Sequence, residues 1–153
     1  MKAELINPFI KASREILQQM ASISSEIGQI TVKESSFPSP NIAILIGLTG
    51  GMRGQVVLGM DESVAKQIAS NMMCGMPVAV LDDMAKSAIS ELGNMILGNA
   101  ATLLYNQGIT IDITPPTLLV GEKITVSTTN MKPVSIPLKT DQGVIEIDIV
   151  VKE

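Results

Sequence analysis

Apolar side chains recur at helical spacing near the start of the chain. Between residues 3 and 21 they are three or four positions apart, with charged and amide side chains between them. This period is typical of an amphipathic helix with one buried face. After Ile27 the pattern changes, because Ile30 and Val32 alternate with polar neighbours before the chain-breaking segment 35–40 (SSFPSP). We therefore predict a helix over 3–21, followed by extended chain.

Two apolar segments rich in β-branched residues flank a glycine-rich connection. The segments are 41–48 (NIAILIGL) and 55–60 (QVVLGM), and the connection is 49–54 (TGGMRG). This arrangement favours a β-hairpin. A phosphate-binding loop would need G-x-x-x-x-G-K-[ST] ahead of a helix, and here the Lys-Ser/Thr pair is missing and a strand follows. We therefore interpret the glycines as turn residues.

Two further helices are expected in the middle of the chain. The first follows Asp61 as its N-cap and ends near Gly75 and Pro77. The second is the longest, running over about 82–107 and ending at Gly108, a residue type that readily adopts a left-handed conformation.

The remaining segments predict strands separated by Pro, Gly and Asp-Gln-Gly turn signals: 110–121, 123–129, 132–140 and 143–151. Few helices are available to connect parallel strands, so most strand pairs are expected to be antiparallel. We therefore predict an α+β fold, a mainly antiparallel sheet packed with about three helices, in a single domain over 1–153.

Composition excludes several chemistries. Among the 153 residues there is no His and no Trp, and Cys74 is the single cysteine. Imidazole bases, His-ligated metals, intrachain disulfides and CxxC motifs are therefore excluded. Catalysis would rest on carboxylates, amides, hydroxyls, Lys, Arg and the backbone.

Charge and hydropathy bear on partners and location. The formal net charge is −4 and only 2% of residues are aromatic, so a nucleic-acid partner is not expected. The start of the chain carries charges where a signal peptide would be apolar, and the apolar runs are shorter than the roughly 18–20 residues that span a bilayer. We expect a cytoplasmic protein without a membrane partner.

The long helix has an unusual polar face. At 100° per residue its apolar positions form a core stripe centred near Ala85, and Ser87, Glu91 and Asn94 lie on the opposite side at i, i+4 and i+7. The Lys/Glu pairs usual on a solvated helix are absent from this face, and it continues into Gly98 and Ala101, whose small side chains allow close approach. Two interpretations stay open at this point: an ordinary solvated face, or a docking face.

The segment 82–100 (DDMAKSAISELGNMILGNA), followed by 111–121 (IDITPPTLLVG), resembles the signature of the CheC/CheX/FliY family of bacterial chemotaxis phosphatases, and within it CheX most closely. The family pattern is an acidic residue or Ser, three others, Glu, two others, Asn, and Pro a little over twenty residues later. Ser87, Glu91, Asn94 and 115–116 (Pro-Pro) match it. The hairpin and the helix after it also follow the CheX order, so the resemblance covers nearly the whole chain and implies a CheC-like fold.

The resemblance implies hydrolysis of the aspartyl-phosphate of a receiver domain such as CheY. In that reading Asn94 orients the attacking water and Glu91 anchors a lysine of the partner, because an amide both donates and accepts hydrogen bonds. Ser87 is the weakest candidate and would contact the partner, together with Gly98 and Ala101. No metal or cofactor of its own is implied, since the receiver supplies Mg²⁺. The resemblance also implies a homodimer joined through a strand edge, for which we expect 143–151.

This function has one alternative, and two further residue patterns need an interpretation. The chain could be a non-catalytic module that binds a receiver domain or the flagellar switch. Glu15 and Gln18 imitate the Glu-x-x-Asn spacing on the first helix, but Lys11 stands in the preceding position and Gln replaces Asn, so one active helix is expected. Asn99, close to the apolar stripe, is expected to satisfy a buried hydrogen bond.

Overall fold

The structure is a computed structural model that describes residues 3–128 and 130–152. The predicted domain range 1–153 and the last residue of the predicted strand 123–129 therefore extend outside the described residues. The elements in chain order are α1 (Ala3–Ala21), β1 (Glu26–Ile27), β2 (Thr31–Val32), β3 (Ser36–Ser39), β4 (Ile42–Gly50), β5 (Arg53–Met60), α2 (Glu62–Met72), α3 (Asp83–Asn106), β6 (Ile111–Ile113), β7 (Thr117–Val120), β8 (Ile124–Ser127), β9 (Val134–Thr140) and β10 (Gly143–Lys152).

Most strands join one antiparallel sheet. Its path is β1-β9-β10-β5-β4-β6, with β2 also pairing with β9 and β7 also pairing with β4. Strands β3 and β8 form a separate two-stranded sheet. The predicted α+β fold, with three helices and a mainly antiparallel sheet in the described residues, is confirmed.

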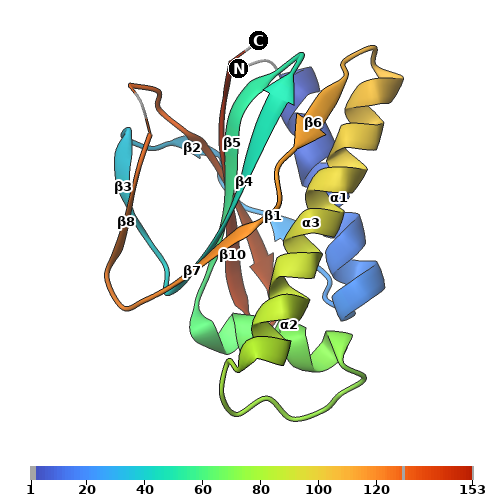
Figure 1. The fold of residues 1–153 in the computed structure, drawn as a ribbon, viewed down its shortest axis with the longest axis vertical. Helices are drawn as coiled ribbons and strands as arrows, with labels where there is room; N and C mark the ends of the chain where they lie inside the picture. Colours follow the sequence, from blue (N-terminus) through green and yellow to red (C-terminus); the bar gives the residue numbers. More distant parts are fainter. Residues whose placement is uncertain (1–2, 129, 153) are drawn as a thin grey trace.

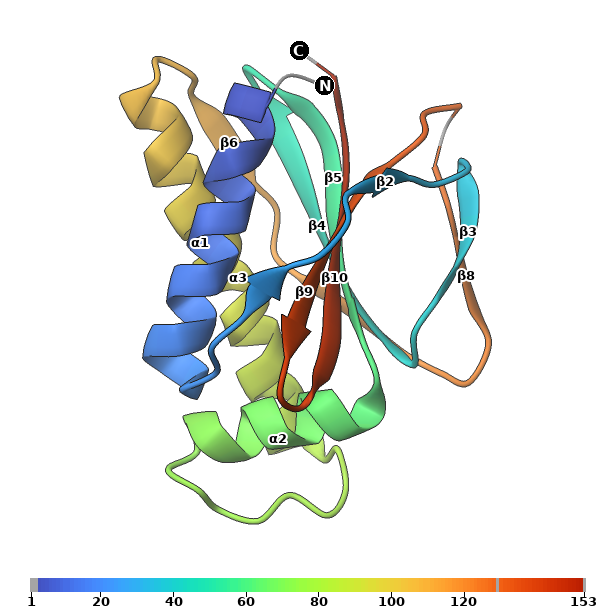
Figure 2. The ribbon, with the colours of Figure 1, turned by 180° about the vertical axis from the view of Figure 1, so that it is seen from behind.

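The helices cover one face of the large sheet. Helices α1 and α3 lie side by side against that face, and α2 crosses one end of it (Figure 1). The β3–β8 pair stands on the opposite side of the sheet, as the view from behind also shows (Figure 2). A small second cluster of Phe37, Ala43, Val57 and Val126 joins this pair to the sheet.

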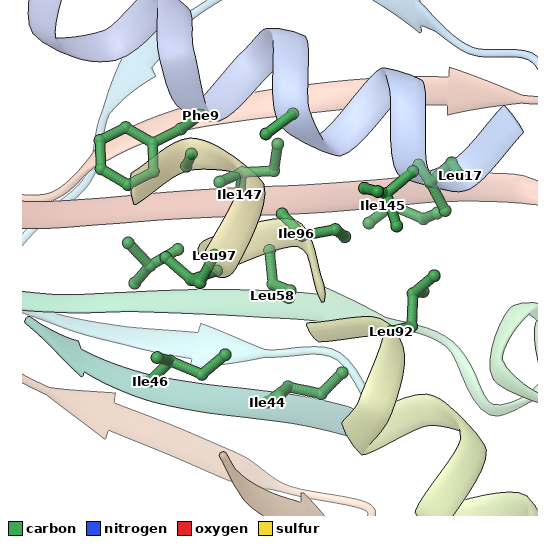
Figure 3. Packing of buried hydrophobic residues seen from close by; sticks show 14 of the residues in the cluster. Phe9, Leu17, Ile44, Ile46, Leu58, Leu92, Ile96, Leu97, Ile145 and Ile147 are labelled. Carbon is green, nitrogen blue, oxygen red and sulfur yellow. The ribbon is translucent and has the colours of Figure 1, made fainter. Parts of the chain in front are cut away.

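The main core lies between the helical layer and the sheet. Side chains of α1, α3, β4, β5 and β10 meet there, among them Phe9, Leu17, Ile44, Leu58, Leu92, Ile96 and Ile147 (Figure 3). Full burial of one such side chain contributes roughly 1.5–3 kcal/mol. The stripe predicted on the long helix supplies Ile89, Leu92 and Ile96 to this core, so the side of α3 that faces the sheet is fixed by hydrophobic packing.

Several local predictions are confirmed. Helix α1 spans Ala3–Ala21 as expected, and β4 and β5 form the predicted hairpin. Helix α3 ends at Asn106, and Gly108 after it has a φ of +87°. Asp61 and Asp82 both hold N-cap positions, but only Asp82 uses its side chain, whose Oδ1 accepts from Ala85 N at 2.9 Å.

One strand prediction is wrong, and it concerns an edge of the sheet. The segment 110–121 forms two strands, β6 and β7, divided at the Pro-Pro pair, in keeping with the predicted Pro turn signals. The segment 143–151 is not an edge strand: β10 pairs with β5 over 146–152 and with β9 over 143–149. The strand therefore lies inside the sheet, and neither of its sides is free along its whole length.

Candidate functional site

A cleft lies between helix α3 and the chain of β6 and β7. Its volume is about 1020 Å³. One wall comes from the first half of α3 and the other from the β6–β7 segment, elements that neighbour each other in Figure 1. The lining residues are Asp83, Lys86, Ser87, Ser90, Glu91, Asn94, Ile113, Thr114, Pro115, Pro116, Leu118 and Val120.

The polar ridge predicted on the long helix forms the α3 wall of this cleft. Ser87 and Glu91 are exposed, and Asn94 is half-buried. All three line the cleft, across from Pro115 and Pro116. The structure therefore brings together residues that are more than twenty positions apart in the sequence.

Hydrophobic packing and capping hold this ridge in place. Leu92 and Ile96 are buried beneath it, so the helix cannot roll without exposing them. The Asp82 cap satisfies one of the free N–H groups of the first turn, a contribution of about 1 kcal/mol. The position of Glu91 and Asn94 is thus fixed by apolar contacts on the far side of the helix.

The ridge side chains are free to engage a partner. Across residues 3–128 and 130–152, the side chains of Ser87, Glu91 and Asn94 take part in none of the hydrogen bonds or ion pairs. An uncommitted amide can donate to one group and accept from another, and an uncommitted carboxylate can accept from a cation. These two groups could therefore orient a water molecule and pair with a positive charge.

Gly98 and Ala101 lie beyond the cleft. Neither is among its lining residues. Gly98 is half-buried, and a Cβ added there would meet no atom within 4 Å, so nothing inside the described chain requires glycine at this position. Ala101 was expected on the outer face, but it is half-buried and packs against the core. The cleft and these two residues thus occupy separate parts of α3.

Several residues without a predicted role also line the cleft. Helical periodicity places Asp83 and Ser90 on the outer face of α3 together with the ridge, but it gives them no role. Lys86 lies about a quarter of a turn from the ridge, at 100° per residue, and is half-buried. Thr114 and Leu118 come from the other wall, where no periodic signal shows which side chains face the helix.

On α1, Glu15 and Gln18 have a spacing similar to that of the motif, but both side chains contact other residues. Glu15 lies 4.0 Å from Lys11 Nζ, and Ser24 donates to Gln18 Oε1 at 2.8 Å. Asn99 was expected to satisfy a buried hydrogen bond; it is half-buried, and its Nδ2 lies 3.5 Å from Glu15 Oε2, at the limit of a hydrogen bond. These contacts tie α1 to its surroundings and to α3.

Two ionisable groups with shifted pKa values lie on the other face of the sheet. Ile147 and Ile149 point into the main core, so Asp148 between them points away from the helices. Burial raises the pKa of Asp148, against the opposing effects of Ser135 and Lys33. Burial by itself would lower the pKa of Lys33, but its hydrogen bonds and charge interactions with Glu146 and Asp148 raise it above 10.5.

The described part of the chain contains no group of three or more His, Cys, Asp or Glu residues arranged to hold a metal ion. None of the helices within 3–128 and 130–152 combines the length and apolar character needed to cross a membrane.

The sequence is similar to a family of known function. The sequence model described as "Chemotaxis phosphatase CheX" matches residues 42–139. The CheY-P phosphatase CheX of Thermotoga maritima is 35% identical to the chain over 127 residues, which cover 82% of this chain and 81% of that protein.

Solved structures share the fold. A CheC-like superfamily protein from Shewanella sp. PV-4 is 24% identical, covers 100% of both chains and superposes with a TM-score of 0.90. The CheX–CheY–BeF3–Mg²⁺ complex from Borrelia burgdorferi contains a chain that is 28% identical, with 97% of each chain covered and a TM-score of 0.80. The expected CheC-like architecture is therefore confirmed.

Proposed function

Because this chain belongs to the chemotaxis phosphatase CheX family and is a phosphatase, we propose that it hydrolyses the aspartyl-phosphate of a CheY-like receiver domain. One observation carries the proposal. The Glu91 carboxylate and the Asn94 amide lie on the same wall of one open cleft, and neither is used in a hydrogen bond or ion pair within the described chain. The chemotaxis role is further supported by the relative from Thermotoga maritima, named a CheY-P phosphatase, and by the Borrelia burgdorferi complex, which contains CheY.

Asn94 is the proposed catalytic residue. Its side chain would accept from and donate to a water molecule, holding the water oxygen in line with the scissile bond. The water oxygen attacks phosphorus, the bond between phosphorus and the aspartyl oxygen breaks, and the products are inorganic phosphate and a free carboxylate. The receiver's own Mg²⁺ would neutralise charge on the phosphoryl oxygens. Such positioning lowers the barrier without a covalent intermediate or an imidazole base.

Glu91 and Ser87 would orient the receiver. Glu91 is exposed one turn before Asn94, so its carboxylate can accept from a lysine of the partner when Asn94 enters the partner's site. Ser87, about one turn before Glu91, would contact the partner backbone. Gly98 would extend this contact surface past the cleft and allow close approach of the partner to the α3 backbone, and only the exposed part of the half-buried Ala101 could add to it.

A homodimer belongs to the same proposal. Since β10 is enclosed by its neighbours, pairing between two copies would use an outer strand of the large sheet. Strands β1 and β2 lie outside β9, and Ile27 and Val32 on them are exposed apolar residues. Light scattering at micromolar concentration is expected to give twice the mass of one chain, and the mass of a single chain would contradict the dimer.

The catalytic assignment can be tested by phosphate release from a phosphorylated cognate receiver. Asn94→Ala is expected to lower kcat by at least about 100-fold, comparable with the loss of one positioned group in other active sites. Glu91→Ala is expected to act mainly on KM. Asn99→Ala, on the same helix but outside the cleft, is the matched control and should retain activity. A wild-type rate no faster than that of Asn94→Ala would refute the catalytic role.

A further inference from the structure

The wall of the cleft opposite α3 contains a β-bulge. Ile113 pairs with Leu48, and Thr117 pairs with Leu45. Two residues of β4 therefore separate these pairs, against three residues of the facing chain, 114–116. One extra residue in one strand is the definition of a bulge, a feature that occurs often beside active sites because it re-aims side chains.

The bulge decides which side chains face the cleft. Successive residues of a strand point to opposite faces, so Ile113 and Leu118, an odd and an even position, would face opposite sides of an uninterrupted strand. Both are half-buried, pack against the main core and line the cleft. The extra residue therefore turns Leu118 towards α3, and it brings Pro115 and Pro116 into the same wall.

Thr114 fastens the start of this bulge to β4. Its backbone N–H donates to the Gly47 carbonyl at 3.0 Å, and its Oγ1 accepts from Gly47 N at 2.8 Å. In a regular antiparallel pair the second bond would end on the Thr114 carbonyl. The hydroxyl has taken the place of that carbonyl, so the chain can turn out of the ladder without leaving the Gly47 N–H unsatisfied.

Pro115 and Pro116, which follow Thr114, cannot form such hydrogen bonds to β4. Pro115 and Pro116 have no backbone N–H, so neither can donate to β4. The Thr114 hydroxyl lies directly before them and also points to the Pro115 carbonyl, at 3.3 Å. The contact is tight from the other side as well, since a Cβ added at Gly47 would lie 3.1 Å from Thr114 Cγ2 and 3.2 Å from its Oγ1.

We propose that Thr114 is a positioning residue for the receiver: the hydrogen bond from Gly47 N to its hydroxyl holds the wall of Pro115 and Pro116 at the distance from Glu91 and Asn94 that the docked receiver requires. The inference rests on the proposed function. Thr114 should therefore affect the affinity for the receiver and not the rate of hydrolysis, because the wall shapes the docking surface while Asn94 orients the water.

Steady-state hydrolysis of the phosphorylated receiver tests this role in three variants. Thr114→Val removes the hydroxyl and is expected to raise KM about 3- to 10-fold, the effect of one hydrogen bond, with kcat within about twofold of wild type. Thr114→Ser retains the hydroxyl and should restore the wild-type KM. A general loss of folded protein would lower the apparent kcat instead and would appear as a lower Tm.

Gly47→Ala distinguishes positioning from direct contact with the receiver. Gly47 lies on β4 and is not among the residues that line the cleft. The added Cβ would press on Thr114, so KM should rise as it does for Thr114→Val. Combining Gly47→Ala with Thr114→Ser removes the methyl group nearest the new Cβ and should return KM towards wild type. A direct contact of Thr114 with the receiver would leave the KM of Gly47→Ala unchanged, which would overturn the proposal.

The two proposals fail in different ways. Binding of a receiver loaded with beryllofluoride and Mg²⁺ gives an affinity that needs no turnover. If wild type binds this receiver without hydrolysing the phosphorylated one, the proposed function fails while Thr114→Val still tests the wall. If wild type is active and Thr114→Val has an unchanged KM, or a lower kcat at constant KM, the inference about Thr114 is overturned. Should Thr114→Val fail to fold, Gly47→Ala alone and with Thr114→Ser decides the question.

Discussion

Gly93 of helix α3 lies directly against Ile44 of strand β4. A Cβ added at Gly93 would stand 2.9 Å from Ile44 Cγ2, closer than folded proteins tolerate, and Ile44 is fully buried. Gly93 is the residue immediately before Asn94. The absence of a side chain thus lets the helix backbone rest on the sheet at the level of the proposed catalytic amide.

Gly93→Ala is expected to destabilise the protein and to lower its activity. Overpacking in a core costs about 1–3 kcal/mol, and the higher helix propensity of alanine returns about 1 kcal/mol, so we expect a net loss of about 1 kcal/mol. Because α3 must move away from β4, the ridge shifts and phosphate release should slow. Urea unfolding and the receiver assay measure the two effects. Unchanged stability would show that Ile44 gives way without cost.

Gly98→Ala is the matched opposite, five residues further along α3. The new methyl group meets no atom within 4 Å, so helix propensity alone should raise the free energy of unfolding by up to about 1 kcal/mol. If the receiver approaches the helix backbone here, its affinity should nevertheless fall several-fold. Unfolding in urea and titration with a beryllofluoride-loaded receiver test both outcomes. A variant that is more stable and binds as wild type does would remove Gly98 from the proposed contact surface.

Local signals predicted the helices and the hairpin because they depend on neighbouring residues. The period of apolar positions defines α1 and the buried side of α3, and it orients Ser87, Glu91 and Asn94 away from the core. The β-branched segments around 49–54 define the β4–β5 hairpin in the same way. Both signals, the turn residues and the period of apolar positions, depend only on residues close together in the sequence.

Strand order and the bulge depend on partners far away in the chain. The run 143–151 is apolar whether it forms an edge or lies between two strands, and only its pairing with β5 and β9 decides. Likewise, a single extra residue near Pro115 changes which side chains of β7 face α3, and periodicity within one strand cannot show where the register shifts. One wall of the cleft was therefore predictable, and the other was not.

The two aspartates at helix N-caps should differ in their contribution. Asp82 Oδ1 accepts from Ala85 N at 2.9 Å, whereas Asp61 holds the N-cap of α2 without a side-chain cap bond. Asp82→Ala is expected to lower the free energy of unfolding by about 1 kcal/mol, and Asp61→Ala by a few tenths at most. Thermal and urea unfolding of both variants measure the difference. Equal losses would mean that charge near the helix start, which both share, outweighs the hydrogen bond.

Lys33 neutralises a buried carboxylate on the face of the sheet away from the cleft. Its Nζ lies 3.0 Å from Asp148 Oδ2 and 2.8 Å from Glu146 Oε2, and the side chain of Asp148 is only 3% exposed. Lys33→Met would leave the Asp148 charge without its nearest cation. We expect the free energy of unfolding at pH 7 to fall by about 3 kcal/mol, since breaking one partner of a buried pair is costly.

The pH dependence of this loss gives its physical cause. Without Lys33 the pKa of Asp148, already raised by burial, should rise further, so protonation at pH 4 removes much of the penalty and the loss should be smaller there than at pH 7. At the alkaline end the sign is set by Lys33, whose pKa is raised by folding. Its stabilising contribution is complete below pH 10.5 and is lost as the pH rises through the folded-state pKa above that value. Urea unfolding of wild type and variant across this range measures both trends.

Lys132→Met is the control. It removes an exposed partner of Glu34 at 3.7 Å and should change the free energy of unfolding by no more than about 0.5 kcal/mol at any pH. An equal loss at pH 4 and pH 7 for Lys33→Met would instead attribute the effect to contacts that do not depend on the Asp148 charge, among them that of Lys33 Nζ with the Phe37 ring, whose centre lies 4.6 Å away.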